Sequence, residues 1–114
     1  MRRGAWLSEF PVAVTVCDRR GRVLEMNRKA CETFERYGGR RLVGKSLLSC
    51  HSPRARRKLR GLLRTGRVNV YTIEKKGARK LIYQGPWFAK GRLAGLVELS
   101  LVLPKKVPHF VRKG

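Results

Sequence analysis

Three strand-like runs separated by two short glycine-containing turns constrain the fold of this chain more than any other feature. They cover residues 68–74, 80–88 and 92–103, and they are rich in β-branched and aromatic side chains. The turns between them are too short for a crossover connection, so the three runs are expected to pair antiparallel as a meander. Pro86 cannot donate to a strand ladder, which predicts a sheet edge or a bulge at that position.

The N-terminal half begins with a predicted β-hairpin. Its strands cover residues 12–17 and 22–26, and its turn contains Asp18 and Gly21, which are residue types that suit tight turns. Asn27 then stands where a helix N-cap is expected, and apolar residues follow it at helical spacing. A short helix is therefore predicted after the hairpin, ending at the glycine pair 38–39.

Two more helical segments are predicted before the meander. Residues 42–48 are apolar, contain Gly44 and are too few for a long helix, so they predict about one turn. Ser52 and Pro53 match an N-cap followed by proline at the first helical position. The helix that they open places its leucines on one face and ends near Gly66, and its opposite face is almost wholly basic.

The order of two strands, three helical segments and three strands predicts an α+β fold. Five strands with one helical layer imply an antiparallel sheet that short helices cover on one face. With 114 residues, the chain has room for a single domain. We assign residues 1–9 to an N-terminal lead-in segment, 10–104 to the domain and 105–114 to a basic C-terminal tail.

The order and spacing of these motifs resemble the PAS family of sensor domains over most of the chain. Residues 10–14 followed by 18–27 resemble its first hairpin, residues 42–45 (Leu-Val-Gly-Lys) are similar to the turn before its long helix, and residues 91–100 resemble its last strand. The resemblance implies a PAS-like five-stranded sheet around a small cavity, which binds a ligand, or an outer sheet face that dimerises. The residues it assigns to the scaffold are Asp18, Gly21, Asn27 and Gly44.

Several classes of protein are not expected. The N-terminal apolar run is too short for a signal peptide, and no stretch approaches the roughly 18 apolar residues that cross a bilayer, so a cytoplasmic location is expected. Cys17, Cys31 and Cys50 form neither an even set nor a CxxC pair, which favours reduced thiols. Because nucleophile-elbow, P-loop and HExxH motifs are missing, we expect no enzymatic activity and no metal site.

The charge of the chain is extreme, with 28 Lys and Arg against 7 Asp and Glu, a formal net charge of +21. Such an excess calls for an anionic partner or for salt to screen it. A cluster on the helix that begins at Ser52 and Pro53 is the candidate surface for nonspecific contact with nucleic acid or another polyanion. Cations also occur along the whole chain, so a solvated basic coat is the alternative. The clustered residues are Arg54, Arg56, Arg57, Lys58, Arg60, Arg64 and Arg67.

Cys50 and His51 come just before the helix start at Ser52 and Pro53 and, by the resemblance, lie near the rim of the family's cavity. They are candidates for haem ligation or for a redox-active thiol, because a helix N-terminus lowers the pKa of a thiol. Ordinary packing at the start of the helix is the alternative reading. Flavin photochemistry is not expected, since residues 45–50 lack the photoreactive cysteine motif of light-sensing members. Candidate cavity residues on the meander, which core packing would equally explain, are Tyr71, Tyr83, Gln84 and Trp87.

The leading functional prediction is a stand-alone cytoplasmic sensor or interaction module. It would act in trans, as a homodimer or with a partner signalling protein, when its cavity is occupied or its sheet is engaged. A polyanion-binding accessory protein on the same scaffold is the first alternative. A haem or thiol redox sensor that uses Cys50 and His51 is the second.

Overall fold

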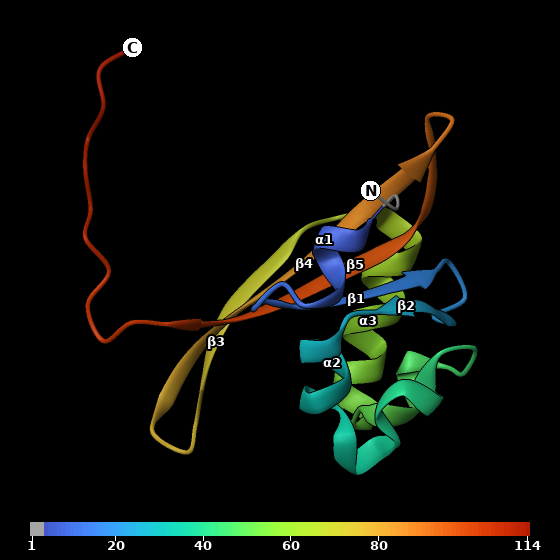
Figure 1. Ribbon diagram of the computed structural model, residues 1–114. Coiled ribbons are helices and arrows are strands. Elements are labelled where there is room, and N and C mark those ends of the chain that lie inside the picture. The colour runs from blue at the N-terminus through green and yellow to red at the C-terminus, as the bar shows by residue number, and fades with distance from the viewer. Residues whose placement is uncertain (1–3) are drawn as a thin grey trace.

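The computed structural model describes residues 4–114, and its framework is one antiparallel sheet with the strand order β2-β1-β5-β4-β3 (Figure 1). Helix α2 and the 3₁₀ turns lie on one side of β1, and helix α1 lies on the other. The strands are β1 (Ala13–Asp18), β2 (Val23–Met26), β3 (Asn69–Lys75), β4 (Ala78–Ala89) and β5 (Arg92–Leu103). The helices are α1 (Ala5–Ser8), α2 (Arg28–Thr33) and α3 (Pro53–Thr65), and the 3₁₀ turns are η1 (Glu35–Tyr37), η2 (Gly39–Leu42) and η3 (Leu47–Cys50). The predicted α+β fold with five antiparallel strands is confirmed.

The predicted meander forms with few changes, and the position of Pro86 has the expected explanation. β3 begins at Asn69, opposite Gln84, so beyond Gln84 strand β4 has a neighbour only on the β5 side. Pro86 lies in this edge segment, where its missing N–H breaks no ladder. A register shift follows between Trp87 and Phe88. The predicted edge and the predicted bulge are therefore both present, within two residues of each other.

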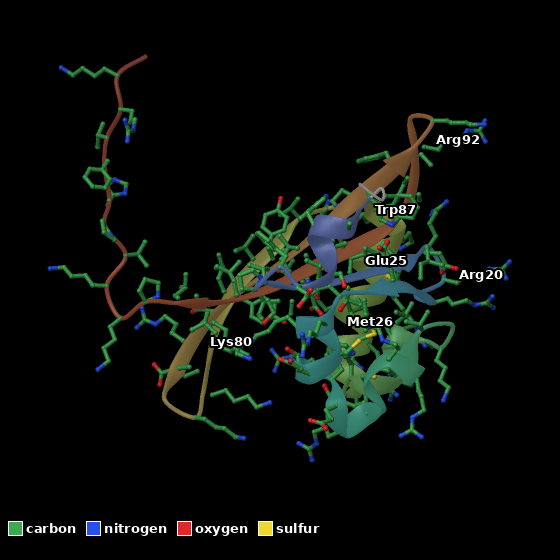
Figure 2. The ribbon with its side chains drawn as sticks, in the orientation of Figure 1. Arg20, Glu25, Met26, Lys80, Trp87 and Arg92 are labelled. Atoms are coloured by element: carbon green, nitrogen blue, oxygen red, sulfur yellow. The ribbon has the colours of Figure 1, made fainter. Side chains whose placement is uncertain are left out.

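Trp87 ties three strands together. Trp87 lies on β4 (Figure 2), and its indole Nε1 donates a hydrogen bond of 2.9 Å to the backbone oxygen of Cys17 on β1, although β5 lies between β1 and β4. Gly95 is the residue of β5 that pairs with Trp87, and a Cβ there would collide with that same Cys17 oxygen and lie 2.8 Å from the indole nitrogen. Glycine at this position is what allows the indole to cross β5.

The predicted hairpin turn and N-cap are also confirmed. The Asp18 carboxylate accepts hydrogen bonds from the backbone N–H groups of Arg20 and Arg22, and Gly21 takes the left-handed conformation that the turn requires. Asn27 is buried and caps α2 by accepting from the N–H of Ala30 at 3.0 Å.

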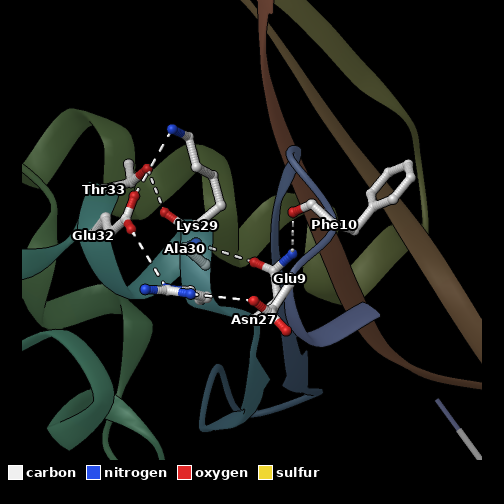
Figure 3. Close-up of polar contacts among 8 residues, drawn as sticks. Glu9, Phe10, Asn27, Lys29, Ala30, Glu32 and Thr33 are labelled. Carbon is white, nitrogen blue, oxygen red and sulfur yellow. Dashed lines mark hydrogen bonds and ion pairs between the residues drawn. The ribbon is translucent and has the colours of Figure 1, made fainter. Parts of the chain in front are cut away.

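Asn27 also organises the segment that precedes β1 (Figure 3). Its side-chain oxygen accepts from the N–H of Val14 at 2.9 Å, and its amide nitrogen donates to the carbonyl of Val12 at 2.7 Å. Longer bonds run from the same nitrogen to the carbonyls of Leu7 at 3.2 Å and Phe10 at 3.4 Å. One buried amide therefore connects α1, β1 and α2.

The core lies between the sheet and the helical layer. Cys17, Val23 and Leu96 are the most deeply buried large side chains on the sheet, and the leucines at 59, 62 and 63 bring the apolar face of α3 onto them. Ser52 caps α3 by accepting from the N–H of Ala55, as predicted.

The structure departs from the sequence prediction in two helices. The lead-in segment contains a four-residue helix, α1, which was not predicted because its one turn lacks an amphipathic repeat. The helix after Asn27 ends at Thr33, earlier than the predicted end at the glycine pair, and the chain continues in 3₁₀ turns. Gly38 and Gly39 both have positive φ, so the backbone turns repeatedly there instead of extending one helix.

The segment 44–47 closes part of the outer edge of β2. Val23 donates to the carbonyl of Lys45 at 2.8 Å and accepts from Gly44 at 2.7 Å, and Leu47 donates to the carbonyl of Gly21 at 2.7 Å. Gly44 has φ +90, which fits its predicted role as a turn residue of the scaffold. Among residues 4–114, no helix is long and apolar enough to span a bilayer.

Candidate ligand cavity and its polar floor

A row of polar side chains crosses the inner face of the sheet. Thr15, Glu98, Gln84 and Asn69 stand directly opposite one another on four adjacent strands, β1, β5, β4 and β3. Asn69 donates to the amide oxygen of Gln84 at 2.8 Å, and Gln84 donates to a carboxyl oxygen of Glu98 at 2.8 Å. Three of the four, all but Asn69, are buried. We call these four residues the polar row.

Two cavities lie between the polar row and the helical layer. The smaller, of about 210 Å³, includes Thr15 and Glu98 in its wall and extends toward Phe34 and Tyr37 beside α2. The larger, of about 620 Å³, includes Asn69 and Gln84 and extends along the first turns of α3. Both cavities share His51 and Tyr71, so these two side chains stand at the boundary between them.

Two ionisable groups in the cavity walls, Glu98 and Tyr71, have raised pKa values. Burial raises the pKa of Glu98, and the opposing effects of the Gln84 hydrogen bond and of the His51 charge are smaller. Burial, followed by the charge of Glu98, raises the pKa of Tyr71. His51 Nδ1 lies 2.9 Å from the carbonyl of Leu47, and because a carbonyl only accepts, Nδ1 carries the proton.

The raised pKa of Glu98 predicts a pH dependence of stability. In the folded state this carboxyl holds its proton more tightly than in the unfolded state, so the free energy of unfolding must fall as the pH rises from about the ordinary pKa of 4.5 through the raised one. Glu98→Gln preserves the acceptor for Gln84 and removes the titration. Urea unfolding of both proteins from pH 4 to pH 8 should show that the free energy of unfolding of the variant increases relative to that of the wild type as the pH rises. Parallel stability curves would contradict the argument.

The structure brings together only half of the predicted cavity residues. His51, Tyr71 and Gln84 line the cavities. Tyr83 alternates with Gln84 along β4 and therefore lies on the opposite face of the sheet, where it is partly exposed. Trp87 lies three residues from Gln84 along β4 and therefore on the opposite face of the sheet, and its indole donates to the Cys17 carbonyl.

Cys50 does not meet the expectations for a reactive thiol. It packs against the hydrophobic core, and burial raises its pKa, whereas the proximity of α3 had suggested a lowered one. The correction has a physical reason: desolvation at this position outweighs the hydrogen bond from Ser49 that favours thiolate. Burial likewise raises the pKa of Cys17 to about 11.

The lining also fits a haem poorly. Cys50 faces the core, so of the two predicted ligands only His51 reaches the cavities. The larger cavity has two apolar side chains in its wall, Ala55 and Leu59, and the rest are polar or charged. A haem macrocycle needs apolar walls on both faces, which this wall does not supply.

Sequence reasoning missed Glu98, Asn69 and Thr15. The signal for Glu98 was present, because it is a carboxylate within a mostly apolar strand. It stands two residues from Leu96 and therefore on the same, inward face of the sheet. Asn69 and Thr15 carried no comparable signal, since their importance comes from the register that aligns them with Glu98.

Members of the predicted basic cluster on α3 border two different pockets. Arg54 and Lys58 border the larger cavity, whereas Arg60 and Arg64 border a separate pocket beside the β1–β2 turn. Arg57 and Arg67 are exposed to solvent, and Arg56 is half-buried.

Comparison with known proteins gives a consistent result. A family model described as PAS fold matches residues 7–103. The PAS domain of BvgS from Bordetella pertussis is 19% identical, with 87% of this chain and 82% of that chain covered and a TM-score of 0.64. The PAS domain of an HTR-like protein from Haloarcula marismortui is 14% identical, with 87% and 92% covered and a TM-score of 0.60.

A further structural neighbour is larger than this chain. VqmA bound to DPO is 14% identical, with 87% of this chain and 56% of that chain covered and a TM-score of 0.65. Another structure of VqmA, from Vibrio cholerae, describes a dimer of a LuxR-type receptor. A search of curated proteins finds no match.

Proposed function

This chain belongs to the PAS family of signalling sensor modules, and from that premise we propose that it senses a small polar molecule held over the polar row. The proposed role is binding without catalysis. One observation carries it: the buried carboxyl of Glu98 has a raised pKa and lies in a cavity wall, and among residues 4–114 Gln84 is the one side chain that donates to it. A buried polar group of this kind favours a ligand that completes its hydrogen bonding.

The lining of the smaller cavity suggests the class of ligand. Glu98 and Ser100 offer hydrogen-bonding groups at its floor, and Arg36, Lys75 and Lys80 contribute cations to its wall. A molecule with a hydrogen-bond donor at one end and an anionic group at the other would complement both. Amino acids and hydroxy acids have this pattern and suit a volume of about 210 Å³.

The proposed output runs through the outer face of the sheet. Val70 and Tyr83 stand exposed there as cross-strand neighbours, and Trp6 and Phe10 of the N-terminal segment are exposed and contact each other edge to face. Apolar side chains exposed in this way favour contact with a second copy or a partner protein. VqmA, which is similar in fold, is described both as a dimer and with DPO bound, which supports this combination.

A ligand screen tests the proposal. Amino acids and hydroxy acids are added to isotope-labelled protein, and we expect one or more to shift the amide signals of His51, Tyr71 and Gln84. Ser100→Phe should abolish the shifts because its ring fills the smaller cavity, whose wall includes Ser100. Thr72→Phe is the matched control. Thr72 is exposed, and because it is next to Tyr71 on β3 it lies on the opposite, outer face of the sheet. An unresponsive wild type, or a response retained in Ser100→Phe, would rule the proposal out.

A further inference from the structure

Four arginines line a pocket that is separate from both cavities. Arg19 and Arg20 come from the turn between β1 and β2, and Arg60 and Arg64 come from successive turns of α3. Leu48 and Leu63 complete the wall, and the pocket has a volume of about 310 Å³. We call this site the arginine pocket. None of its six residues lines the cavities described above.

Within the described part of the chain, no ion pair joins a carboxylate to these guanidinium groups. The ion pairs among residues 4–114 join Arg28 and Lys29 to Glu9 and Glu32, on the N-terminal segment and α2. Asp18 is the acidic residue nearest in sequence, but its carboxylate accepts from two backbone N–H groups of the turn. The arginine pocket is therefore a concentration of like charge, which destabilises the folded chain unless an anion is bound.

The chemistry of the pocket points to phosphate. The planar guanidinium groups of arginine bind phosphate oxygens in bidentate fashion and keep their charge at any physiological pH. The arginines come from two separate elements, so they border a pocket instead of forming a single row along one helix. The buried Leu63 supplies a fixed floor for the aliphatic stems.

The charge around the arginine pocket selects the kind of phosphate compound. Arg22 and Arg57 are exposed on the same two elements, and Arg67 follows the end of α3, so cations extend beyond the pocket itself. A small phosphorylated molecule would neutralise only the pocket, whereas a phosphodiester chain could also contact this wider surface. We propose that the arginine pocket anchors the backbone of a nucleic acid, independently of the sensor cavity.

The test compares two variants with the same change in charge. The site variant carries Arg19→Gln, Arg20→Gln, Arg60→Gln and Arg64→Gln. The control variant removes four exposed cations elsewhere, by Arg40→Gln, Arg41→Gln, Arg92→Gln and Lys106→Gln. Figure 2 shows Arg20 and Arg92 on different turns, with both side chains extending away from the sheet. Circular dichroism checks that each variant is folded.

Binding of a fluorescent single-stranded oligonucleotide is measured by anisotropy between about 50 and about 200 mM salt. We expect the site variant to bind at least tenfold more weakly than wild type at low salt, and its salt slope to be smaller by about 2 to 3, since each phosphate contact contributes about 0.7. The control variant should lose less than about threefold. Equal losses of affinity in the two variants would mean that binding depends on total positive charge. The arginine pocket would then not be a specific phosphate site.

A nucleoside triphosphate separates the two sources of phosphate. If the triphosphate binds wild type as tightly as the oligonucleotide does, the nucleic-acid assignment is wrong. Weak competition, with half-displacement only at a large excess over the oligonucleotide, supports it. Because the sensor cavity is intact in both variants, failure here leaves the amino-acid and hydroxy-acid screen unaffected.

Discussion

Gly95→Ala is expected to lower the free energy of unfolding by roughly 3 kcal/mol. The added methyl group would occupy the place through which the Trp87 indole reaches the Cys17 carbonyl, and it would collide with that carbonyl oxygen. Either β1 or the indole must move. Moving β1 disturbs its ladder with β5, and moving the indole leaves its N–H without the present acceptor.

Thermal unfolding measures this effect directly. A loss of this size should lower the midpoint by on the order of 10 to 20 °C in a domain of this length. Gly61→Ala is the matched control, because Gly61 lies within α3 and a Cβ there meets no other atom within 4 Å. That control should gain about 0.5 to 1 kcal/mol from better helix propensity. Equal midpoints for the two alanine variants would contradict the proposed packing.

Asn27→Ala is expected to be at least as damaging, with a loss of roughly 3 to 4 kcal/mol. The substitution removes one helix cap and leaves the N–H of Val14 and the carbonyl of Val12 without the partners they have now. Each unsatisfied buried group costs about 1 to 3 kcal/mol. The attachment of α1 would weaken as well, because the Asn27 amide donates to Leu7.

Two further variants separate the cap from the rest of the Asn27 network. Ser52→Ala removes the equivalent cap of α3, which involves no buried side chain, and should cost only about 1 kcal/mol. Asn27→Asp keeps the acceptor for Val14 and Ala30 but loses the donor for Val12 and buries a charge. Chemical denaturation should therefore rank Asn27→Asp well below Ser52→Ala in stability. Similar losses for Asn27→Ala and Ser52→Ala would mean that capping alone explains the residue.

Most of the fold could be predicted because its signals are local. The glycine turns of the meander, the Asp18–Gly21 turn, the Asn27 cap and the Ser52-Pro53 helix start each depend on residues within a few positions of one another. These features form through hydrogen bonds between residues close in sequence, so the residue types that favour them can be recognised in the sequence. α1 lacked such a signal, because its position depends on the distant Asn27 amide.

The candidate site was harder to predict because strand register creates it. Glu98, Gln84, Asn69 and Thr15 come from four strands, and no spacing within one segment shows that they align. Tyr83 looked as suitable as Tyr71, yet each lies on a different face because a strand changes face at every residue. Arg19 and Arg20 likewise meet α3 only in the folded chain.

The two edges of the sheet are unequal, and this limits how copies of the chain could join by adding strand to strand. β2 has four residues, and the segment 44–47 already occupies the backbone of Val23 on its outer side. The stretch left open is shorter than a typical strand. β3, with seven residues, presents the longer free edge. Two copies that paired along β3 would form a continuous sheet with a β2 edge at each end, so that growth would stop at two chains and no fibre would follow.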